Sequence, residues 1–206
     1  MAYRETPRMK ARKEATRQRI IDTTHTLIGE GGFGKASVAR VAERAGVATG
    51  SVYRHFESKS DLFAEVFRRA TEQEVRKVAE TLAAGAPLDQ ALEESLRIFA
   101  RRAIRGRIMA WALIAEPVDP LVDEERLRYR QAYAELFERN LEKGIDEGCY
   151  RAGLTPRLTS AAIVGAMAEP LVGPLSPASE ELSDRAAEQL IQDIVRFCMQ
   201  AVCKGE

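Results

Sequence analysis

Residues 36–63, ASVARVAERAGVATGSVYRHFESKSDLF, constrain the fold of this chain more than any other segment. Val38, Val41 and Ala42 are spaced at i, i+3 and i+4, which places them on one face of a short helix. Ser37 precedes this face and carries a side-chain oxygen suited to an N-cap. The segment therefore begins with a short amphipathic helix whose start is marked.

The sequence Ala45-Gly46-Val47 predicts a tight turn after this helix, because glycine readily takes the left-handed conformation that closes a helix. A second short helix is expected from about Thr49 to His55. Val52 and Phe56 should point into the core, which leaves the polar side chains toward solvent or a ligand. Two helices joined by a short turn containing glycine form a helix-turn-helix unit, whose second helix enters the major groove of DNA.

This pattern resembles the N-terminal signature of the TetR family of bacterial transcriptional repressors. The matching residues are Ser37, Ala42, Ala45-Gly46-Val47, Thr49-Gly50-Ser51-Val52-Tyr53, His55-Phe56 and Lys59. The resemblance covers about a quarter of the chain, and the remainder agrees with the family only in length and helical character. Arg54 occupies a position that varies in the family, so no target sequence follows from it.

The helix-turn-helix unit supplies the candidate DNA contacts. The first residues of a recognition helix reach base edges, and Gly50 lets the backbone approach closely. The resemblance implies that Tyr53, His55 and Lys59 bind phosphates, with Lys59 helped by the dipole of the next helix. Arg54 either reads guanine or holds a phosphate. The candidates are Ser37, Arg40, Thr49, Gly50, Ser51, Tyr53, Arg54, His55 and Lys59. For the arginines of the first helix, Arg40 and Arg44, the alternative is a solvated surface charge.

The charge distribution agrees with a DNA-binding N-terminal part. Residues 1–60 hold 12 Lys and Arg against 6 Asp and Glu, a balance of +6, although the whole chain is neutral. Residues 61–206 hold 19 and 25, a balance of −6. Phosphate neutralisation needs positive charge only at the binding surface. The basic residues of segment 1–16 form either a solvated tail or an arm that touches phosphates or the minor groove.

The remaining sequence predicts amphipathic helices separated by glycine and proline breaks, with no strand signal. The expected helices outside the helix-turn-helix cover residues 12–30, 58–76 and beyond, 88–104, 108–115, 121–147, 157–172 and 180–204. Gly31-Gly32 should end the first of these helices, and Pro170 should kink or end the penultimate one. The fold class is therefore all-α with about nine helices. Residues 1–57 are expected to form the DNA-binding domain, with a disordered basic arm at about residues 1–11. Residues 58–206 are expected to bind an effector and dimerise.

The resemblance implies a ligand pocket between the helices that follow the DNA-binding domain. Mostly aromatic and sulfur-containing side chains suggest an apolar or aromatic small molecule. The candidate effector-binding residues are Phe63, Phe67, Phe99, Arg101, Met109, Trp111, Tyr129, Tyr133 and Met167. Core packing is the alternative for each. Arg97, Arg101 and Arg105 recur every four residues. They form either a solvated face with ion pairs such as Glu93–Arg97, or a site for the phosphates of an anionic effector such as an acyl-CoA.

The resemblance also implies a two-fold homodimer in which the last two helices of each subunit form a four-helix bundle. The broad apolar face of the last helix and the small residues of the preceding helix agree with this expectation, as does a palindromic DNA site. The candidate dimer-interface residues are Ala161, Gly165, Ala187, Leu190, Ile191, Ile194 and Cys198. The alternative is that these residues form the core of a single chain.

Other classes of protein find little support in the sequence. Cys149, Cys198 and Cys203 are an odd, scattered set that suits free thiols in a reducing cytoplasm and predicts neither a metal site nor a cofactor. No apolar run is expected to approach the roughly 20 residues of a membrane span, so neither a membrane partner nor a location outside the cytoplasm and nucleoid is expected. No catalytic motif is recognisable, and the chain has only 2 histidines, which argues against an enzyme.

The sequence therefore predicts a homodimeric repressor that binds a palindromic operator in double-stranded DNA and is released by a small, apolar effector. Two alternatives remain open at this point. One is a transcriptional activator of the same fold. The other is a sequence-nonspecific DNA-binding protein, whose affinity would depend steeply on salt and little on sequence.

Overall fold

The computed structural model describes residues 6–204, and within this range the chain folds into nine α-helices with no strand. The helices are α1 (Pro7–Lys35), α2 (Val38–Ala45), α3 (Thr49–Val52), α4 (Lys59–Leu82), α5 (Leu88–Arg105), α6 (Arg107–Ile114), α7 (Pro120–Asp146), α8 (Pro156–Leu175) and α9 (Asp184–Val202). The predicted all-α class with about nine helices is confirmed. An isolated antiparallel bridge between Tyr150 and Cys203 ties the end of α9 to the α7–α8 loop.

The first helix differs from its prediction at both ends. It begins at Pro7 and not at Arg12, because Thr6 accepts the amide of Met9 at 3.3 Å and proline suits the first helical position. Residues 7–11 of the predicted disordered arm are therefore helical, and residues 1–5 lie outside the described range. Gly31-Gly32 leaves helical geometry as predicted, with φ of +77° at Gly32, but a further short turn reaches Lys35.

The penultimate helix continues through Pro170 and Pro174 to Leu175, so Pro170 does not end it. A proline inside a helix costs about 3 kcal/mol or more. Leu171 and Leu175 lie on the buried face of this last turn, at 0% and 2% exposure. Burying a leucine contributes about 1.5–3 kcal/mol, so packing of these two side chains offsets part of the cost of the two prolines.

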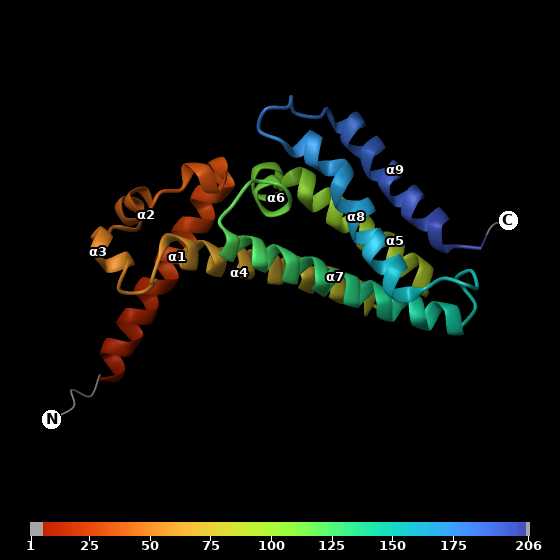
Figure 1. Ribbon diagram of the computed structural model, residues 1–206, viewed down its shortest axis with the longest axis horizontal. Coiled ribbons are helices and arrows are strands. Elements are labelled where there is room, and N and C mark those ends of the chain that lie inside the picture. The colour runs from red at the N-terminus through yellow and green to blue at the C-terminus, as the bar shows by residue number, and fades with distance from the viewer. Residues whose placement is uncertain (1–5, 205–206) are drawn as a thin grey trace.

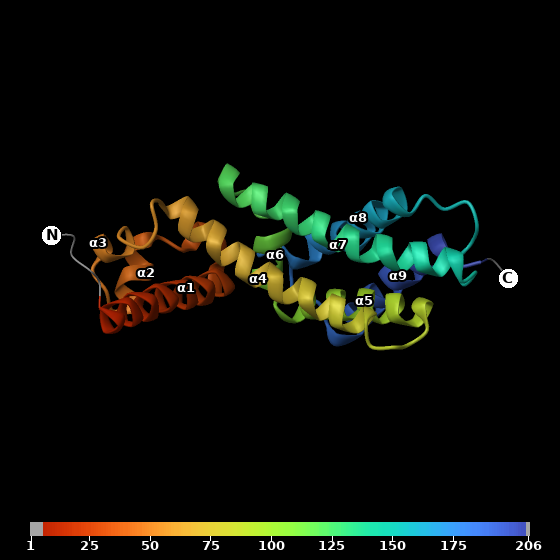
Figure 2. The same cartoon turned by 90° about the horizontal axis from the view of Figure 1, so that it is seen from below.

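The helices divide between two hydrophobic cores. The first core joins α1, α2, α3 and the first half of α4, and it includes Ala112, Leu113 and Val122 from the α6–α7 region. The second core joins the rest of α4 with α5, α7, α8 and α9. Figure 1 shows α2 and α3 at one end of the molecule and α9 toward the other, with α4 leading from one core to the other. Figure 2 shows α4 and α7 lying side by side through the middle of the molecule. The helix-turn-helix is thus held at one tip by α1 and α4.

One helix in the described range, α8, is long and apolar enough to cross a membrane by length and composition, which the sequence analysis did not foresee. Core helices pass the same test. In the folded chain α8 packs against α5, α6, α7 and α9, and 39% of its most apolar stretch is buried. Packing inside the chain therefore accounts for part of its apolar composition.

Candidate DNA-binding surface and internal cavities

The helix-turn-helix has the turn and the first helix that its sequence predicts, but α3 ends at Val52 and not at about His55, so Tyr53, Arg54 and His55 lie in the turn that follows it. Gly46 closes α2 in the left-handed conformation, with φ of +66°, and its amide donates to the carbonyl of Glu43 at 3.1 Å. Ser37 caps the start of α2 by accepting the amide of Arg40 at 3.2 Å. Val52 is 1% exposed, which fixes the buried side of α3. The opposite side of α3 therefore faces away from the chain.

Most candidate DNA contacts are exposed on this tip. The exposed members are Ser37, Arg40, Thr49, Gly50, Tyr53, Arg54 and Lys59, while Ser51 and His55 are half-buried. Apart from its chain neighbours and the backbone of its own helix, no atom of residues 6–204 lies within 4 Å of the position that a Cβ at Gly50 would take. Nothing inside the protein therefore requires a glycine there, and the missing side chain leaves room for an external surface.

The basic side chains around α2 and α4 differ in how they are held. Arg44 forms a bidentate ion pair with Glu30 of α1 at 2.5 and 2.6 Å, and this hydrogen bonding raises its pKa. Arg44 therefore fastens α2 to α1 and is neutralised. Arg40 donates to the carbonyl of Lys35 at 3.1 Å, a neutral acceptor that does not pair its charge. Lys59 lies 4.9 Å from the ring centroid of Phe63, a cation–π contact that steadies it at the start of α4.

The first half of α1 lies beside the recognition helix, which the sequence reasoning did not establish. Burial lowers the pKa of His55, and the positive charges of Lys13 and Arg17 lower it further, against a smaller opposing effect of Glu14. The guanidinium of Arg17 lies 5.1 Å from the ring centroid of Phe56. The basic run before residue 20 was the available signal, but its position beside His55 depends on how α1 packs.

An apolar cavity of about 90 Å³ lies between the helices of the body. It adjoins a smaller cavity of about 20 Å³, and the two share Phe99 and Tyr129 as lining residues. Together they bring together five of the predicted effector-binding residues, Phe99, Met109, Tyr129, Tyr133 and Met167.

The other predicted effector-binding residues line neither cavity. Phe63 and Phe67 are buried in the first core, where Phe33 packs against Phe63 at a centroid distance of 5.2 Å. Trp111 packs, half-buried, against the second core. Arg101 is 3.6 Å from Glu188 of α9. Sequence spacing places these side chains on apolar helices but does not say which neighbour each one meets.

Two polar pairs interrupt the apolar cavity walls. The hydroxyls of Tyr129 and Tyr133 are 2.9 Å apart, and burial raises the pKa of both phenols. Arg102 forms a bidentate ion pair with Glu74 at 2.6 Å, which raises the pKa of Arg102. Neither Glu74 nor Arg102 was predicted as a site residue, because their pairing joins positions 28 residues apart on α4 and α5.

The cavity helices are connected to α1 by a buried carboxylate. Glu116, 7% exposed, accepts the amides of Phe33 and Gly34 at 2.8 and 2.9 Å. We call this pair of hydrogen bonds the Glu116 clamp. A Cβ at Gly32 would lie 2.6 Å from a carboxylate oxygen of Glu116, so the clamp needs glycine at this position.

Arg126 contacts the backbone around Glu116 on the side that faces the smaller cavity. Its guanidinium donates to the carbonyls of Leu113 and Glu116 at 3.0 and 2.7 Å. Arg126 also lines the smaller cavity. One guanidinium therefore joins the cavity, the end of α6 and the residue that clamps α1. The sequence showed only a break rich in proline between α6 and α7.

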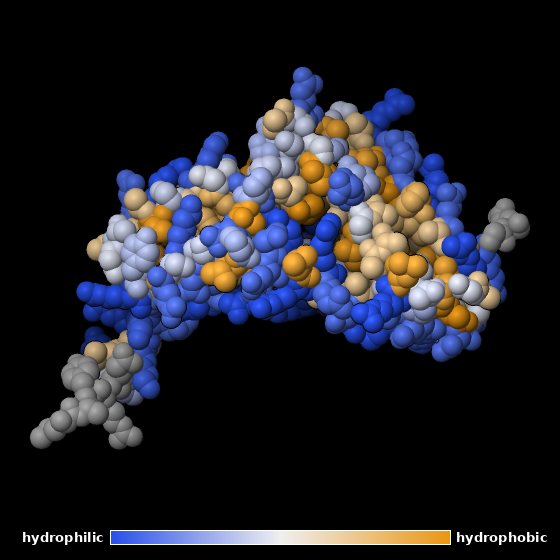
Figure 3. Space-filling model, viewed as in Figure 1, coloured by the Kyte–Doolittle hydropathy of each residue, from blue (hydrophilic) through white to orange (hydrophobic). Residues whose placement is uncertain are grey.

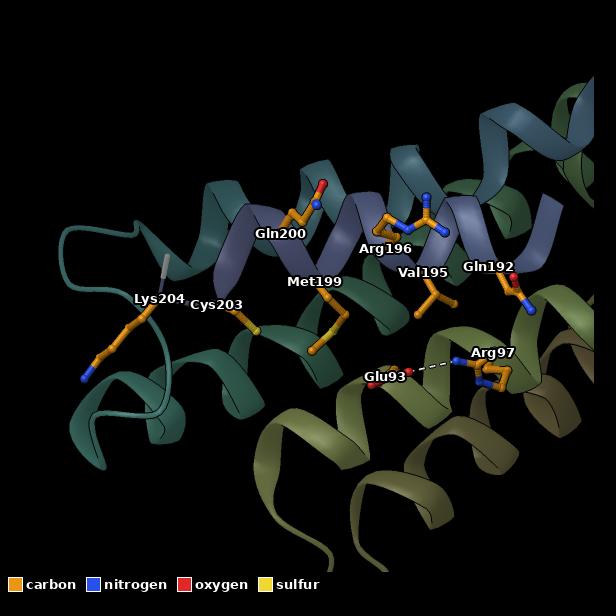
Figure 4. A pocket seen from close by; sticks show the side chains of 9 residues that line it. All are labelled: Glu93, Arg97, Gln192, Val195, Arg196, Met199, Gln200, Cys203 and Lys204. Carbon is orange, nitrogen blue, oxygen red and sulfur yellow. Dashed lines mark hydrogen bonds and ion pairs between the residues drawn. The ribbon is translucent and has the colours of Figure 1, made fainter. Parts of the chain in front are cut away.

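A groove of about 740 Å³ runs between α5 and α9 and was not predicted (Figure 4). Its lining is mixed, and the ion pair Glu93–Arg97 at 2.7 Å lies along it. Arg97 also approaches Glu188 of α9 at 3.9 Å. The arginines at 97 and 101, two of the three considered as a phosphate site, therefore face carboxylates of this chain.

The predicted dimer-interface residues fall into two groups. Ile191, Ile194 and Cys198 are at most 3% exposed and belong to the core of the chain itself. The other four, Ala161, Gly165, Ala187 and Leu190, are exposed or half-buried. Leu158 and Phe197, which the sequence prediction does not include, are 70% and 65% exposed on α8 and α9. Figure 3 shows apolar residues gathering over the region of α8.

A helix-turn-helix at one tip, followed by an all-helical body with internal cavities, defines the class of helix-turn-helix transcriptional regulators. The family model described as "Bacterial regulatory proteins, tetR family" matches residues 20–66. The HTH-type transcriptional repressor KstR2 of Rhodococcus jostii (strain RHA1) is 31% identical over 151 residues, which covers 71% of this chain and 73% of that protein. The chain belongs to the TetR family of transcriptional regulators.

Further similarities extend over most of the fold. The fatty acid metabolism regulator protein of Bacillus subtilis (strain 168) is 26% identical over 157 residues, covering 73% of this chain and 78% of that protein. The crystal structure of FadR from Bacillus subtilis in complex with stearoyl-CoA superposes with a TM-score of 0.71 at 20% identity. It covers 88% of this chain and 97% of that chain. These proteins are transcriptional regulators, and the chain is a DNA-binding regulator and not an enzyme.

Proposed function

We propose that this protein is a repressor that binds a palindromic operator as a homodimer and is released by a small amphipathic effector with a long apolar part. The observation that carries the proposal is the Glu116 clamp, which joins the helices around the apolar cavities to α1 of the DNA-binding unit. A change in those helices can reach the recognition helix through this connection. We place the boundary between the two domains at the start of α4. Residues 1–57 are proposed to bind DNA, and residues 58–206 are proposed to bind the effector and the partner subunit.

At the DNA, the start of α3 is proposed to read bases and its surroundings to hold phosphates. Thr49, Gly50 and Ser51 come first on the recognition helix, where side chains reach base edges. The phosphate contacts are proposed to be Ser37, Arg40, Tyr53, His55 and Lys59. Arg54, which is exposed, is assigned to base readout.

The two-fold dimer is proposed to form through the exposed faces of α8 and α9. Leu158 and Phe197 are large apolar side chains that the chain itself leaves uncovered. The small residues Ala161 and Gly165 allow a partner helix to approach. Such a dimer presents two recognition helices to successive major grooves, which are about 34 Å apart on B-DNA.

The size of the cavities explains how an effector could act. Ligand sites usually have volumes of about 300–1,000 Å³, but the two joined cavities measure about 90 and 20 Å³. An acyl chain therefore has to displace the surrounding helices, including α6 and α7. Release of the operator then follows if the effector binds the displaced state more tightly than the compact one. The FadR structure that holds stearoyl-CoA supports a fatty acyl thioester as the class to test first.

The experiment that tests the proposed function is selection of genomic fragments by the purified protein at two salt concentrations. A few palindromic sites that persist at the higher salt are expected. Unselective recovery that collapses with salt would instead identify a nonspecific DNA-binding protein. A reporter gene behind a recovered site should be expressed less when the protein is present.

A further inference from the structure

An open cavity of about 440 Å³ lies on the outside of the molecule, where α1 meets the turn between α5 and α6. His25 of α1, Arg105 and Arg107 line it, together with Glu181 of the α8–α9 loop. The DNA-binding unit forms one wall and the body forms the other.

The charge in this outer cavity is unbalanced. Arg105 is exposed and, within residues 6–204, has no hydrogen-bond or ion-pair partner. The guanidinium of Arg107 donates to the carbonyls of Ser176 and Ser179, and its buried Nε has no partner. These carbonyls orient Arg107 without neutralising it. Among the lining residues Glu181 is the one carboxylate, so two guanidinium groups face a single negative charge.

The start of α6 adds to the positive potential. Its cap residue, Gly106, has no side chain to accept the first amides, and its first turn contains no acidic residue. These amides and the positive end of the helix dipole favour an anion at this position. Gly106 lines the outer cavity, so the uncapped end of α6 lies at its wall.

The outer cavity and the apolar cavity share part of their lining. Gly106 and Met109 line both of them. A molecule with an apolar end in the inner cavity can therefore place a polar end among the arginines of the outer one. Of the three regularly spaced arginines, Arg105 is the one that forms no ion pair with a carboxylate of residues 6–204, whereas Arg97 and Arg101 face Glu188.

We infer that the outer cavity binds the phosphate-bearing end of the effector, and that the effector is a thioester of coenzyme A rather than a free fatty acid. This inference rests on the proposed function, because it assigns the second half of the same ligand. The ligand then bridges α1 and the α5–α6 turn, on the same helix α1 whose end the Glu116 clamp holds. Binding of the ligand thereby changes the position of the DNA-binding unit relative to the body.

The test compares three proteins and two probes. Wild type, Arg105→Gln and Arg139→Gln are titrated with stearoyl-CoA below its micelle-forming concentration and with stearate, with binding measured by calorimetry. Arg139 is the matched control, since it is also an exposed arginine without a hydrogen-bond or ion-pair partner among residues 6–204, but lies on α7 outside both cavities. Arg105→Gln should weaken stearoyl-CoA binding by about tenfold, as expected for one lost charged hydrogen bond, and leave stearate binding unchanged. Arg139→Gln should bind both probes as wild type does.

Two results overturn the inference, and they can be told apart. If Arg105→Gln binds stearoyl-CoA as tightly as wild type, or if Arg139→Gln loses as much affinity, the outer cavity is not the phosphate site, although the proposed acyl effector stands. If wild type binds neither probe, the inference falls together with the proposed effector class, while operator binding is unaffected by the result.

Discussion

Replacement of Glu116 by glutamine is the perturbation that most directly addresses the connection between the two parts of the molecule. The carboxylate accepts two amides at 2.8 and 2.9 Å and is 7% exposed. Glutamine offers one carbonyl oxygen and turns an NH₂ group toward the second amide. One charge-assisted bond, about 1.5–3 kcal/mol, is lost and one buried amide is left unsatisfied.

We expect a loss of about 3 kcal/mol in the free energy of unfolding from these terms. For a chain of this length, a change of 1 kcal/mol shifts Tm by about 2–4 °C, so Tm should fall by roughly 6–12 °C. Circular dichroism measures the shift at fixed protein concentration, because dimerisation makes Tm depend on concentration. Glu124→Gln is the control, since Glu124 is an exposed acidic residue in the first turns of α7 and has no hydrogen-bond or ion-pair partner within the described part of the chain.

The same variant tests the coupling. The helix-turn-helix has its own core, so Glu116→Gln should still bind the operator. Release of the variant from the operator should require a higher concentration of stearoyl-CoA than release of wild type does. Displacement of α6 and α7 no longer shifts α1 once the Glu116 clamp is weakened. An unchanged Tm together with an unchanged ligand response would refute the reasoning, since the clamp would then carry neither stability nor signal.

Three further predictions concern DNA and the partner subunit. Tyr53→Ala and Lys59→Ala should weaken binding alike on all DNA sequences, whereas Thr49→Ala should change the preference between sequences; a competition assay with single-base operator variants separates the two patterns. Operator affinity should rise as pH falls toward the lowered pKa of His55 in the free protein, because a nearby phosphate favours the protonated imidazole. His55→Gln should flatten this dependence, and an equal slope in both proteins would exclude His55 as its source. Phe197→Asp should shift the protein from dimer to monomer in sedimentation velocity, and a stable dimer would place the interface elsewhere.

The sequence was sufficient where the determining contacts are local. The spacing of Val38 and Val41, and the glycine at residue 46, predict the bounds of α2 because a short helix and its turn depend on neighbours a few residues away. The start of α1 was also readable from Thr6 and Pro7, a capping residue followed by a proline, but the basic composition of that stretch suggested a tail.

The sequence was insufficient where distant segments meet. The Glu116 clamp joins residues 83 positions apart, and the sequence around either residue does not indicate that the two segments meet. The apolar face of α9 was predicted as broad, but periodicity does not show which part the chain covers by itself; Ile194 is buried and Phe197 is exposed although both are apolar. Phe67 was assigned to a pocket for the same reason, since an aromatic residue in a core and one in a cavity wall have the same spacing.

We propose above all that a ligand bound in the cavities of the body controls the affinity of the helix-turn-helix for DNA. Its most direct test is the affinity of the wild-type dimer for a recovered operator, measured by fluorescence anisotropy across a titration of stearoyl-CoA. A saturable loss of affinity, accompanied by the reciprocal weakening of stearoyl-CoA binding when operator is present, is the predicted result. Saturable binding of stearoyl-CoA with no change in operator affinity would contradict the claim, because the cavity and the DNA-binding surface would then be independent.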